Sequence, residues 1–232
     1  MKKNLYPKVD KTYLTKKAKP KEYFKLIVNY LKKYKKEASL LDIGCASGDF
    51  LKMLSNEKQY SLTGVDFSKN SLVVAKKRVP EANFQLKNLE KIELNRKFDF
   101  CTCLGTLAIF DDLFKIINRL INLVKKEGEL IFFELINEHD VNVIMRYQNN
   151  FDKKTEWLSG FNTYSKNYWK QQLKSNLKIK SFTFEKFNIE MHIKQNLKNP
   201  MRAWTIPFNQ KNQIVVGTGQ LLNYYIIKIK LK

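Results

Sequence analysis

The sequence predicts an α/β fold in which a mostly parallel sheet has helices on both faces. Short apolar runs alternate with segments of helical periodicity along residues 21–137, a pattern typical of repeated strand–helix–strand units. The first apolar run enters a glycine turn, and the second ends on a carboxylate. Two further alternating runs follow after residue 177, which brings the expected sheet to seven strands.

The first helix and strand follow from apolar spacing. Within 21–36 apolar residues recur at helical intervals, with lysines on the opposite face. The run ASLLDIG at 38–44 has the character of a short buried strand that enters a glycine turn. Helical spacing then resumes over 47–56, so a second helix is expected there.

The next three strands are short and apolar. SLTGVDF at 61–67 predicts the second strand, and Ser68 is placed to cap a helix that continues to about Arg78. NFQL at 83–86 predicts a third strand, and FDFCTCLG at 98–105 predicts a fourth.

The last elements complete the alternation. A helix is expected over 111–126, and GELIFFELI at 128–136 predicts the fifth strand. A further helix is expected over 163–176, with Thr163 or Ser165 as its cap. The late strands are expected from alternating residues at 178–189 and 224–231. Residues 138–162 are expected to be irregular, and 190–222 to form a polar and aromatic insertion between the two late strands.

The formal net charge of +21 is concentrated at the two ends, and residues 1–36 hold thirteen lysines against Asp10 and Glu22. A basic surface attracts anionic partners such as nucleic acid or phosphorylated small molecules. The chain has 38 lysines but only five arginines, and arginine makes the bidentate contacts of nucleic-acid recognition. We therefore favour compositional drift over selection for RNA binding.

Other classes are disfavoured by composition. No run approaches 18 apolar residues, and the basic N-terminal residues precede no apolar segment, so neither a membrane span nor a signal peptide is expected. The cysteines Cys45, Cys101 and Cys103 lack CxxC spacing and companion histidines. Reduced thiols, a cytoplasmic location and no metal site are therefore expected.

The segment LLDIGCASGDFLKML at 40–54 places two glycines between a strand and a helix. Gly44 and Gly48 permit positive φ and close approach of the backbone to a ligand. A dinucleotide fingerprint would need glycine where the chain has Ala46 and Asp49, and the Asp49 carboxylate would repel a pyrophosphate.

This segment resembles the first motif of the class I, Rossmann-like S-adenosylmethionine-dependent methyltransferases, D-x-G-x-x-x-G after a buried strand. The resemblance covers about residues 38–137 in order and spacing. It implies S-adenosylmethionine as the methyl donor, S-adenosylhomocysteine as the product, and a sheet whose last strand is antiparallel. A single domain is then expected over 1–232. Its parts are a cofactor-binding core at about 21–137 and a small cap from 1–20, 138–162 and 190–222.

The resemblance also carries cofactor-binding roles to residues at the ends of the strands. Asp42 would help to fix the turn and the amino group of the ligand, Asp66 would accept both ribose hydroxyls, and Phe67 would pack on the adenine. Asn88 stands where the family has an acid facing the adenine amine, and its carbonyl could accept instead. The full expected set is Asp42, Gly44, Cys45, Ala46, Gly48, Asp66, Phe67, Asn88, Leu89, Cys103 and Leu104.

A sulfonium donor is already activated, so methyl transfer needs mainly positioning, but an oxygen or protonated amine acceptor also needs a base. His139, shortly after the fifth strand, is the candidate base. Four polar residues near it in sequence could orient it: Glu134, Asn137, Glu138 and Asp140.

Substrate contacts are expected from the insertion and the N-terminus. Arg202 is the only arginine of 190–222 and is followed by Trp204, and a guanidinium beside aromatic rings suits a phosphate or carboxylate. Tyr13 is a further candidate because it precedes the first helix.

The acceptor class follows partly from what the sequence lacks. The fourth strand is followed by CLGT and not by the N/D-P-P-Y/F/W signature of many amine methyltransferases that act on DNA bases. The preferred hypothesis is methyl transfer to an oxygen, less so a nitrogen, of a small anionic molecule such as a sugar or phosphorylated metabolite. Two alternatives stay open: an RNA methyltransferase that uses the basic ends, and a non-catalytic cofactor-binding partner subunit.

Overall fold

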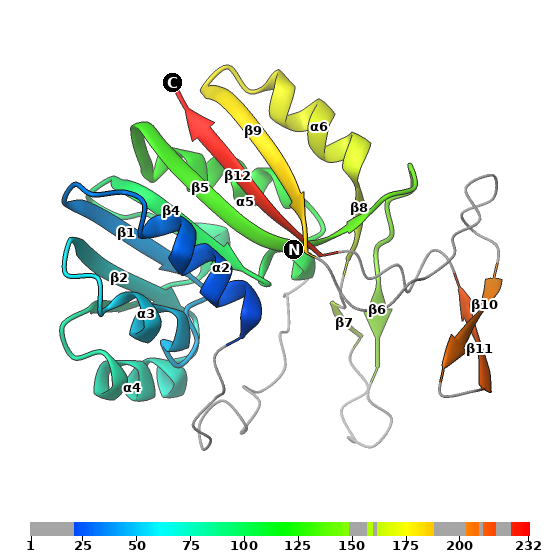
Figure 1. Cartoon of the computed structure of the whole chain (residues 1–232), viewed down its shortest axis with the longest axis horizontal. Helices are drawn as coiled ribbons and strands as arrows, with labels where there is room; N and C mark the ends of the chain where they lie inside the picture. Colours follow the sequence, from blue (N-terminus) through cyan, green and yellow to red (C-terminus); the bar gives the residue numbers. More distant parts are fainter. Residues whose placement is uncertain (1–20, 149–156, 160–161, 188–202, 209–210, 217–223) are drawn as a thin grey trace.

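The computed structural model describes residues 21–148, 157–159, 162–187, 203–208, 211–216 and 224–232. Its main sheet is formed by β1 (Ala38–Ile43), β2 (Tyr60–Asp66), β3 (Asn83–Leu86), β4 (Phe98–Leu104), β5 (Val124–Asn137), β8 (Tyr164–Ser165), β9 (Ile179–Lys186) and β12 (Tyr224–Leu231). The strand order is β3-β2-β1-β4-β5-β12-β9, and β8 pairs with the end of β5 (Figure 1).

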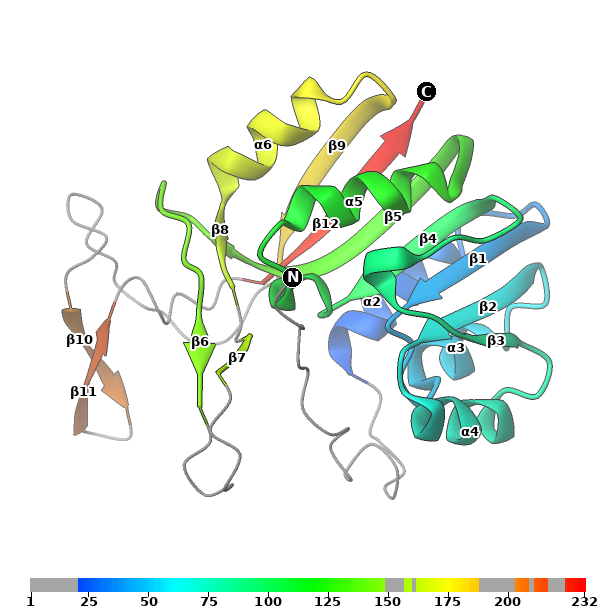
Figure 2. The same ribbon diagram turned by 180° about the vertical axis from the view of Figure 1, so that it is seen from behind.

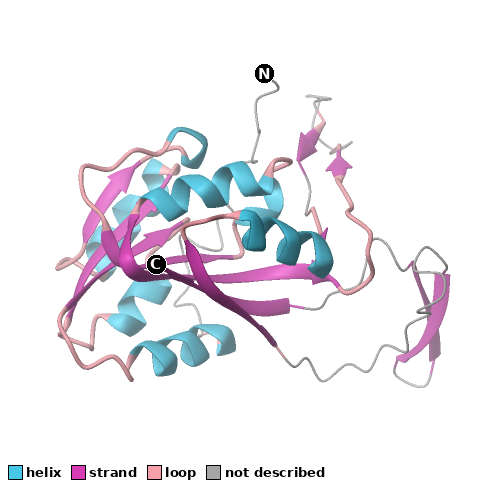
Figure 3. Cartoon of the chain, turned by 90° about the horizontal axis from the view of Figure 1, so that it is seen from above, coloured by secondary structure: helices cyan, strands magenta, loops and turns pink. Residues whose placement is uncertain are grey.

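The helices divide between the two faces of the sheet. They are α2 (Glu22–Leu31), α3 (Asp49–Leu54), α4 (Lys69–Arg78), α5 (Leu113–Asn122) and α6 (Lys166–Ser175), with short 3₁₀ helices η1 (Leu89–Lys91) and η2 (Leu107–Ile109). Helices α2, α3 and α4 lie in front of the sheet in Figure 1, and α5 and α6 cover the face seen in Figure 2. Figure 3 shows from above that the strands run between helices.

The direction of the strands determines where a ligand can bind. Strands β1 to β5 pair in parallel, as the alternation of strands and helices predicted, and β12 runs antiparallel between β5 and β9, as the family resemblance implied. The strand order reverses between β1 and β4, and open α/β sheets bind ligands beyond the carboxyl ends of the strands at such a reversal. The loops after β1, β2, β3 and β4 therefore meet at this edge.

Two apolar layers hold the helices to the sheet. Leu51 and Leu54 of α3 pack with Leu31 of α2 on one face, while Trp169 of α6 packs with Phe132 of β5 on the other. Strand β5 is apolar on both faces because helices cover both. Each large apolar side chain buried in these layers contributes about 1.5–3 kcal/mol relative to exposure.

The expectation of a helix over 111–126 was wrong at its C-terminal end. Helix α5 ends at Asn122, and Val124 already pairs with Phe98 as the start of β5. Glu127 has a φ of 59°, and a Cβ on Gly128 would lie 2.6 Å from Val124 Cγ1, so the strand makes a tight irregular turn there. The Lys-Lys-Glu run favours helix locally, but pairing with β4 outweighs that small preference.

Other differences concern short elements. The first helix ends at Leu31, earlier than the expected 36. The segment 138–162, expected to be irregular, contains β6 (Arg146–Tyr147), which pairs antiparallel with β7 (Leu158–Ser159). The insertion 190–222 contains the antiparallel pair of β10 (Ala203–Phe208) and β11 (Lys211–Val216). Together with β8, the two-residue strands β6 and β7 are too short to show a hydrophobic period.

Among the described residues no helix has both the length and the apolar character that crossing a bilayer requires.

Gly64 on β2 provides a test of core packing next to the glycine turn. A Cβ there would lie 2.6 Å from Phe84 Cε1 and 2.9 Å from Cys45 Sγ. We expect Gly64→Ala to lower the free energy of unfolding by about 1–3 kcal/mol through overpacking, as measured by urea denaturation. The exposed Ser61→Ala on the same strand should cost less than about 0.5 kcal/mol. Equal costs would show that the Phe84 ring can move aside freely.

Candidate functional site

The turn after β1 has an unusual backbone. Gly44, Ala46 and Gly48 all have positive φ, at 69°, 46° and 78°. Glycine adopts this region freely, whereas a non-glycine residue such as Ala46 does so at a cost, so other contacts must hold the turn.

Asp66, the last residue of β2, supplies the main contact to this turn. Its Oδ2 accepts the Ala46 N–H at 2.9 Å, and its Oδ1 accepts the Ser68 N–H at 2.8 Å. Asp66 is buried, and burial raises its pKa while these backbone N–H groups oppose the rise. The carboxylate thus joins the loops after β1 and β2.

Arg78 holds the other side of the turn and was not selected from the sequence. From the last turn of α4 its guanidinium donates to Ser47 Oγ at 2.8 Å and to the Asp49 carboxylate. The Asp49 charge is thereby neutralised. Composition could have pointed to Arg78, because the chain has only five arginines beside 38 lysines and the guanidinium suits fixed contacts with several hydrogen bonds.

Asp42 lies within β1 just before the turn and is 2% exposed. Thr102 Oγ1 of the neighbouring β4 donates to its Oδ1 at 2.7 Å. Burial raises the pKa of Asp42 to about 7; the Thr102 bond opposes this rise and the nearby Asp66 charge adds to it. Asp42 is therefore a buried acid that retains its proton well above the usual range.

The end of β4 lies next to the end of β1, where Cys103 pairs with Ile43. Cys103 is fully buried and Leu104 partly exposed, and burial raises the pKa of the Cys103 thiol well above its ordinary value. Burial likewise raises the pKa of Cys45. These thiols are apolar wall residues and not nucleophiles.

The adenine-side residues lie at the ends of β2 and β3. Phe67 directly follows β2 and is 53% exposed, whereas Leu89 in η1 is buried. The Asn88 carbonyl, expected to face an adenine amine, accepts the Glu90 N–H at 2.8 Å and caps η1. That oxygen has one donor and a second lone pair, so its expected contact with an adenine amine stays a prediction.

His139 follows the end of β5 and is 6% exposed. Its backbone N–H donates to Asn137 Oδ1 at 3.0 Å, and within the described part of the chain its Nε2 is buried without a hydrogen-bond partner. Among the described residues, no group therefore occupies the His139 Nε2 atom.

Three of the four residues expected to orient His139 bond elsewhere, which corrects that expectation. Glu138 accepts from Tyr225 and Lys186, Asp140 accepts from Ser165 and Asn167, and Glu134 accepts from the loop after β4. The Asn137 side chain accepts the backbone N–H of His139.

The substrate candidates from the flanking segments cannot be added to this geometry. Tyr13 and Arg202 lie outside the described residues, and Trp204 lies in β10, where the backbone alone is described. Within the described ranges no three potential ligands among His, Cys, Asp and Glu gather as a metal site would require.

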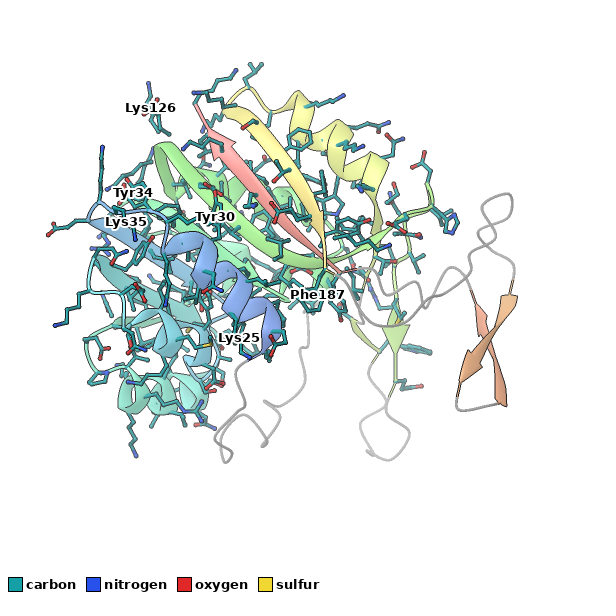
Figure 4. All side chains as sticks on the ribbon, in the orientation of Figure 1. Lys25, Tyr30, Tyr34, Lys35, Lys126 and Phe187 are labelled. Carbon is teal, nitrogen blue, oxygen red and sulfur yellow. The ribbon has the colours of Figure 1, made fainter. Side chains whose placement is uncertain are left out.

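A groove of about 490 Å³ lies elsewhere, between α2 and strands β9 and β12. Tyr30 of α2 and Phe187 after β9 line it (Figure 4), and Lys228 lies 4.2 Å from the Tyr30 ring centroid. None of the residues expected to bind the cofactor lines this groove, so it is separate from the site around the glycine turn.

Comparison with known proteins places this geometry in a family. A family model described as a methyltransferase domain matches residues 15–182. The chain is 31% identical over 101 residues to a malonyl-[acyl-carrier protein] O-methyltransferase of Acetivibrio thermocellus, a match over 42% of this chain and 36% of that protein. The chain spans between about a third and a half of the length of the curated relatives it matches.

Solved structures share the fold at low identity. The PH0226 protein of Pyrococcus horikoshii OT3 aligns with a TM-score of 0.60 at 17% identity, over 97% of both chains. A magnesium protoporphyrin IX methyltransferase of Synechocystis PCC 6803, solved with bound SAM, aligns with a TM-score of 0.54 at 14% identity, over 91% of this chain and 79% of that one.

The raised pKa of Asp42 predicts a pH dependence of stability. Between about pH 4 and 7 the unfolded chain has released this proton and the folded chain still holds it, so stability falls as pH rises through this window. Asp42→Asn keeps an acceptor for Thr102 and removes the titration. We expect the variant to be more stable than the parent chain in urea denaturation above pH 7, with no such gain near pH 4.

Asp99→Asn is the matched control for Asp42→Asn. Despite partial burial, hydrogen bonds from Ser39 and Lys125 lower the pKa of Asp99, so its contribution to stability is present at high pH and lost on acidification. This control should therefore be less stable than the parent chain above pH 7. A loss of stability in both variants above pH 7 would contradict the assignment for Asp42.

Proposed function

The chain belongs to the methyltransferase-domain family, and on that premise we propose that it transfers a methyl group from S-adenosylmethionine to an oxygen of a small anionic molecule. The observation that carries the proposal is the bond between Asp66 and the left-handed turn at Ala46, located where the strand order reverses between β1 and β4. Crevices at such reversals are the ordinary ligand sites of open α/β sheets.

The residues present fit the donor. Asp66 accepts the backbone N–H groups of Ala46, Ser68 and Phe67. An ionised carboxylate can accept about four hydrogen bonds, so at least one ribose hydroxyl can be bound without breaking the turn. The Phe67 ring, 53% exposed at the end of β2, would pack on the adenine. The backbone between Gly44 and Gly48 would meet the methionyl group, with Asp42 helping to fix its amino group.

S-adenosylmethionine supplies an already activated methyl group, so the chain's own residues have to orient the acceptor and receive its proton. His139 Nε2 is the proposed acceptor of that proton, because it is buried and bonds no other described group.

Positive charge near His139 supports an anionic acceptor. Lys166 Nζ lies 3.4 Å from the Tyr225 hydroxyl, and Lys186 Nζ lies 3.3 Å from the Glu138 carboxylate. Lys166 of α6 and Lys186 of β9 both act on the Glu138 carboxylate, the residue before His139, so two positive charges face one negative charge there. The curated name of one relative, an O-methyltransferase acting on a malonyl group, supports oxygen as the acceptor atom.

Donor binding is the first test. Asp66→Ala should weaken S-adenosylhomocysteine binding by about 1.5–3 kcal/mol in calorimetry, the range for a hydrogen bond to a charged group. Asp99→Ala removes a carboxylate at the opposite end of the sheet and should leave the affinity unchanged. Equal affinity in the Asp66 variant would refute the ribose contact, and NADH should give no binding signal.

Proton transfer is the second test. His139→Ala should keep cofactor affinity and lower turnover to S-adenosylhomocysteine by roughly 10²–10⁴, the usual contribution of a positioned base. Turnover would be measured with a fractionated small-molecule extract as the source of acceptor. Unchanged turnover would place the base elsewhere. Turnover that requires RNA would favour an RNA methyltransferase. If no fraction supports turnover, a non-catalytic cofactor-binding subunit would be favoured.

A further inference from the structure

The loop after β4 is held from a neighbouring strand. Thr106 is the N-cap residue of η2, but its side chain makes no capping bond. Instead Glu134 Oε1, from β5, accepts the Thr106 N–H at 3.0 Å and the Leu107 N–H at 2.8 Å. The first N–H groups of a helix need such acceptors, so Glu134 performs the capping that the local sequence leaves undone.

The Thr106 side chain is instead directed against the cofactor turn. A Cβ on Gly44 would lie 2.3 Å from Thr106 Oγ1, so the hydroxyl occupies the space that only a glycine leaves open. Gly44 is thus required by this contact as well as by its φ of 69°. Any shift of Thr106 would change the wall against which the turn packs.

The far side of the same loop is bonded to the segment before α6. The Asn162 N–H donates to the Ala108 carbonyl at 2.7 Å, and the Tyr164 hydroxyl donates to the Phe110 carbonyl at 2.9 Å. The loop therefore lies between the turn after β1 and the segment at 162–164. A shift of this loop would therefore change its contacts with both segments.

Glu134 suits this capping role chemically. It is 3% exposed, and no lysine, arginine or histidine pairs with it in the part of the chain that the structure describes. Burial raises its pKa to about 8, opposed by the backbone N–H groups of the loop. The carboxyl therefore keeps its proton through much of the neutral range, and a neutral amide is a close mimic of it.

We propose that Glu134 is a positioning residue for methyl transfer, which holds the loop after β4 against the cofactor turn and so sets the wall between donor and acceptor. This inference rests on the proposed function and deepens it. Glu134 acts through Thr106 and Leu107 and needs no contact with substrate.

The strand itself offers a matched control. Glu129 lies on β5 as well, is 8% exposed, and accepts the Tyr30 hydroxyl at 2.8 Å towards the other end of the sheet. Replacing it removes a buried carboxylate from the same strand without touching the loop after β4.

The experiment compares Glu134→Gln, Glu134→Asp, Glu134→Leu and Glu129→Leu. Amide exchange at Thr106 and Leu107 is measured by NMR in the ligand-free chain, and S-adenosylhomocysteine affinity by calorimetry. Glutamine keeps the carbonyl acceptor, so we expect exchange and affinity within about threefold of the parent chain. Aspartate is too short to reach both N–H groups, and leucine has no acceptor. In each of these two variants we expect amide exchange at Thr106 and Leu107 to be at least about tenfold faster, and S-adenosylhomocysteine affinity to be at least about tenfold weaker. Glu129→Leu should change neither.

The two readouts separate the two ideas. If the parent chain binds no S-adenosylhomocysteine, the proposed function fails, yet amide exchange still reports whether Glu134 holds the loop. If Glu134→Asp matches the parent chain, or if Glu134→Gln exchanges as fast as leucine, the positioning role is wrong. Should leucine fail to fold, the aspartate and glutamine variants decide alone.

Discussion

The hydrogen bond from the Ala46 N–H to the Asp66 carboxylate is the interaction on which the rest of the site depends. A non-glycine residue at positive φ costs about 1–3 kcal/mol, and it persists only where its surroundings determine it. Asp66 at the end of β2 fixes the turn by accepting the Ala46 N–H, and Arg78 of α4 fixes it by donating to Ser47 Oγ. The turn is thus shaped by two elements that follow it in the chain.

Among the described residues, three buried carboxyl groups lie at this edge of a strongly basic chain. Asp42, Asp66 and Glu134 are each less than 9% exposed, and burial raises the pKa of all three. A buried carboxyl is costly unless it is hydrogen-bonded. Here the bonds come from the Thr102 hydroxyl and from backbone N–H groups of the loops, so satisfying each acid also fixes a loop or a strand pair. At each of these three positions, the hydrogen bonds that offset the cost of burying the carboxyl group also hold the backbone in place.

Much of the architecture was predictable because local patterns and long-range pairing agree. The alternation of apolar runs and helical spacing predicted the parallel sheet, and the glycine pattern predicted the left-handed turn at Gly44 and Gly48. The helix over 111–126 was overextended because Lys125 and Lys126 suit a helix locally while β4 pairs with that segment. Single-segment patterns carry no information about a partner strand.

By itself the sequence determined the fold class, the family resemblance and the candidates at the strand ends, because these depend on residue spacing along one segment. Only the tertiary structure decided which groups meet: Arg78 with the turn, Glu134 with the loop after β4, and Thr106 with Gly44. The expected support of His139 by Glu138 and Asp140 failed for the same reason, since both acids found partners on distant elements. Hydrogen-bond partners are chosen by distance in space, and spacing along the chain does not encode that distance.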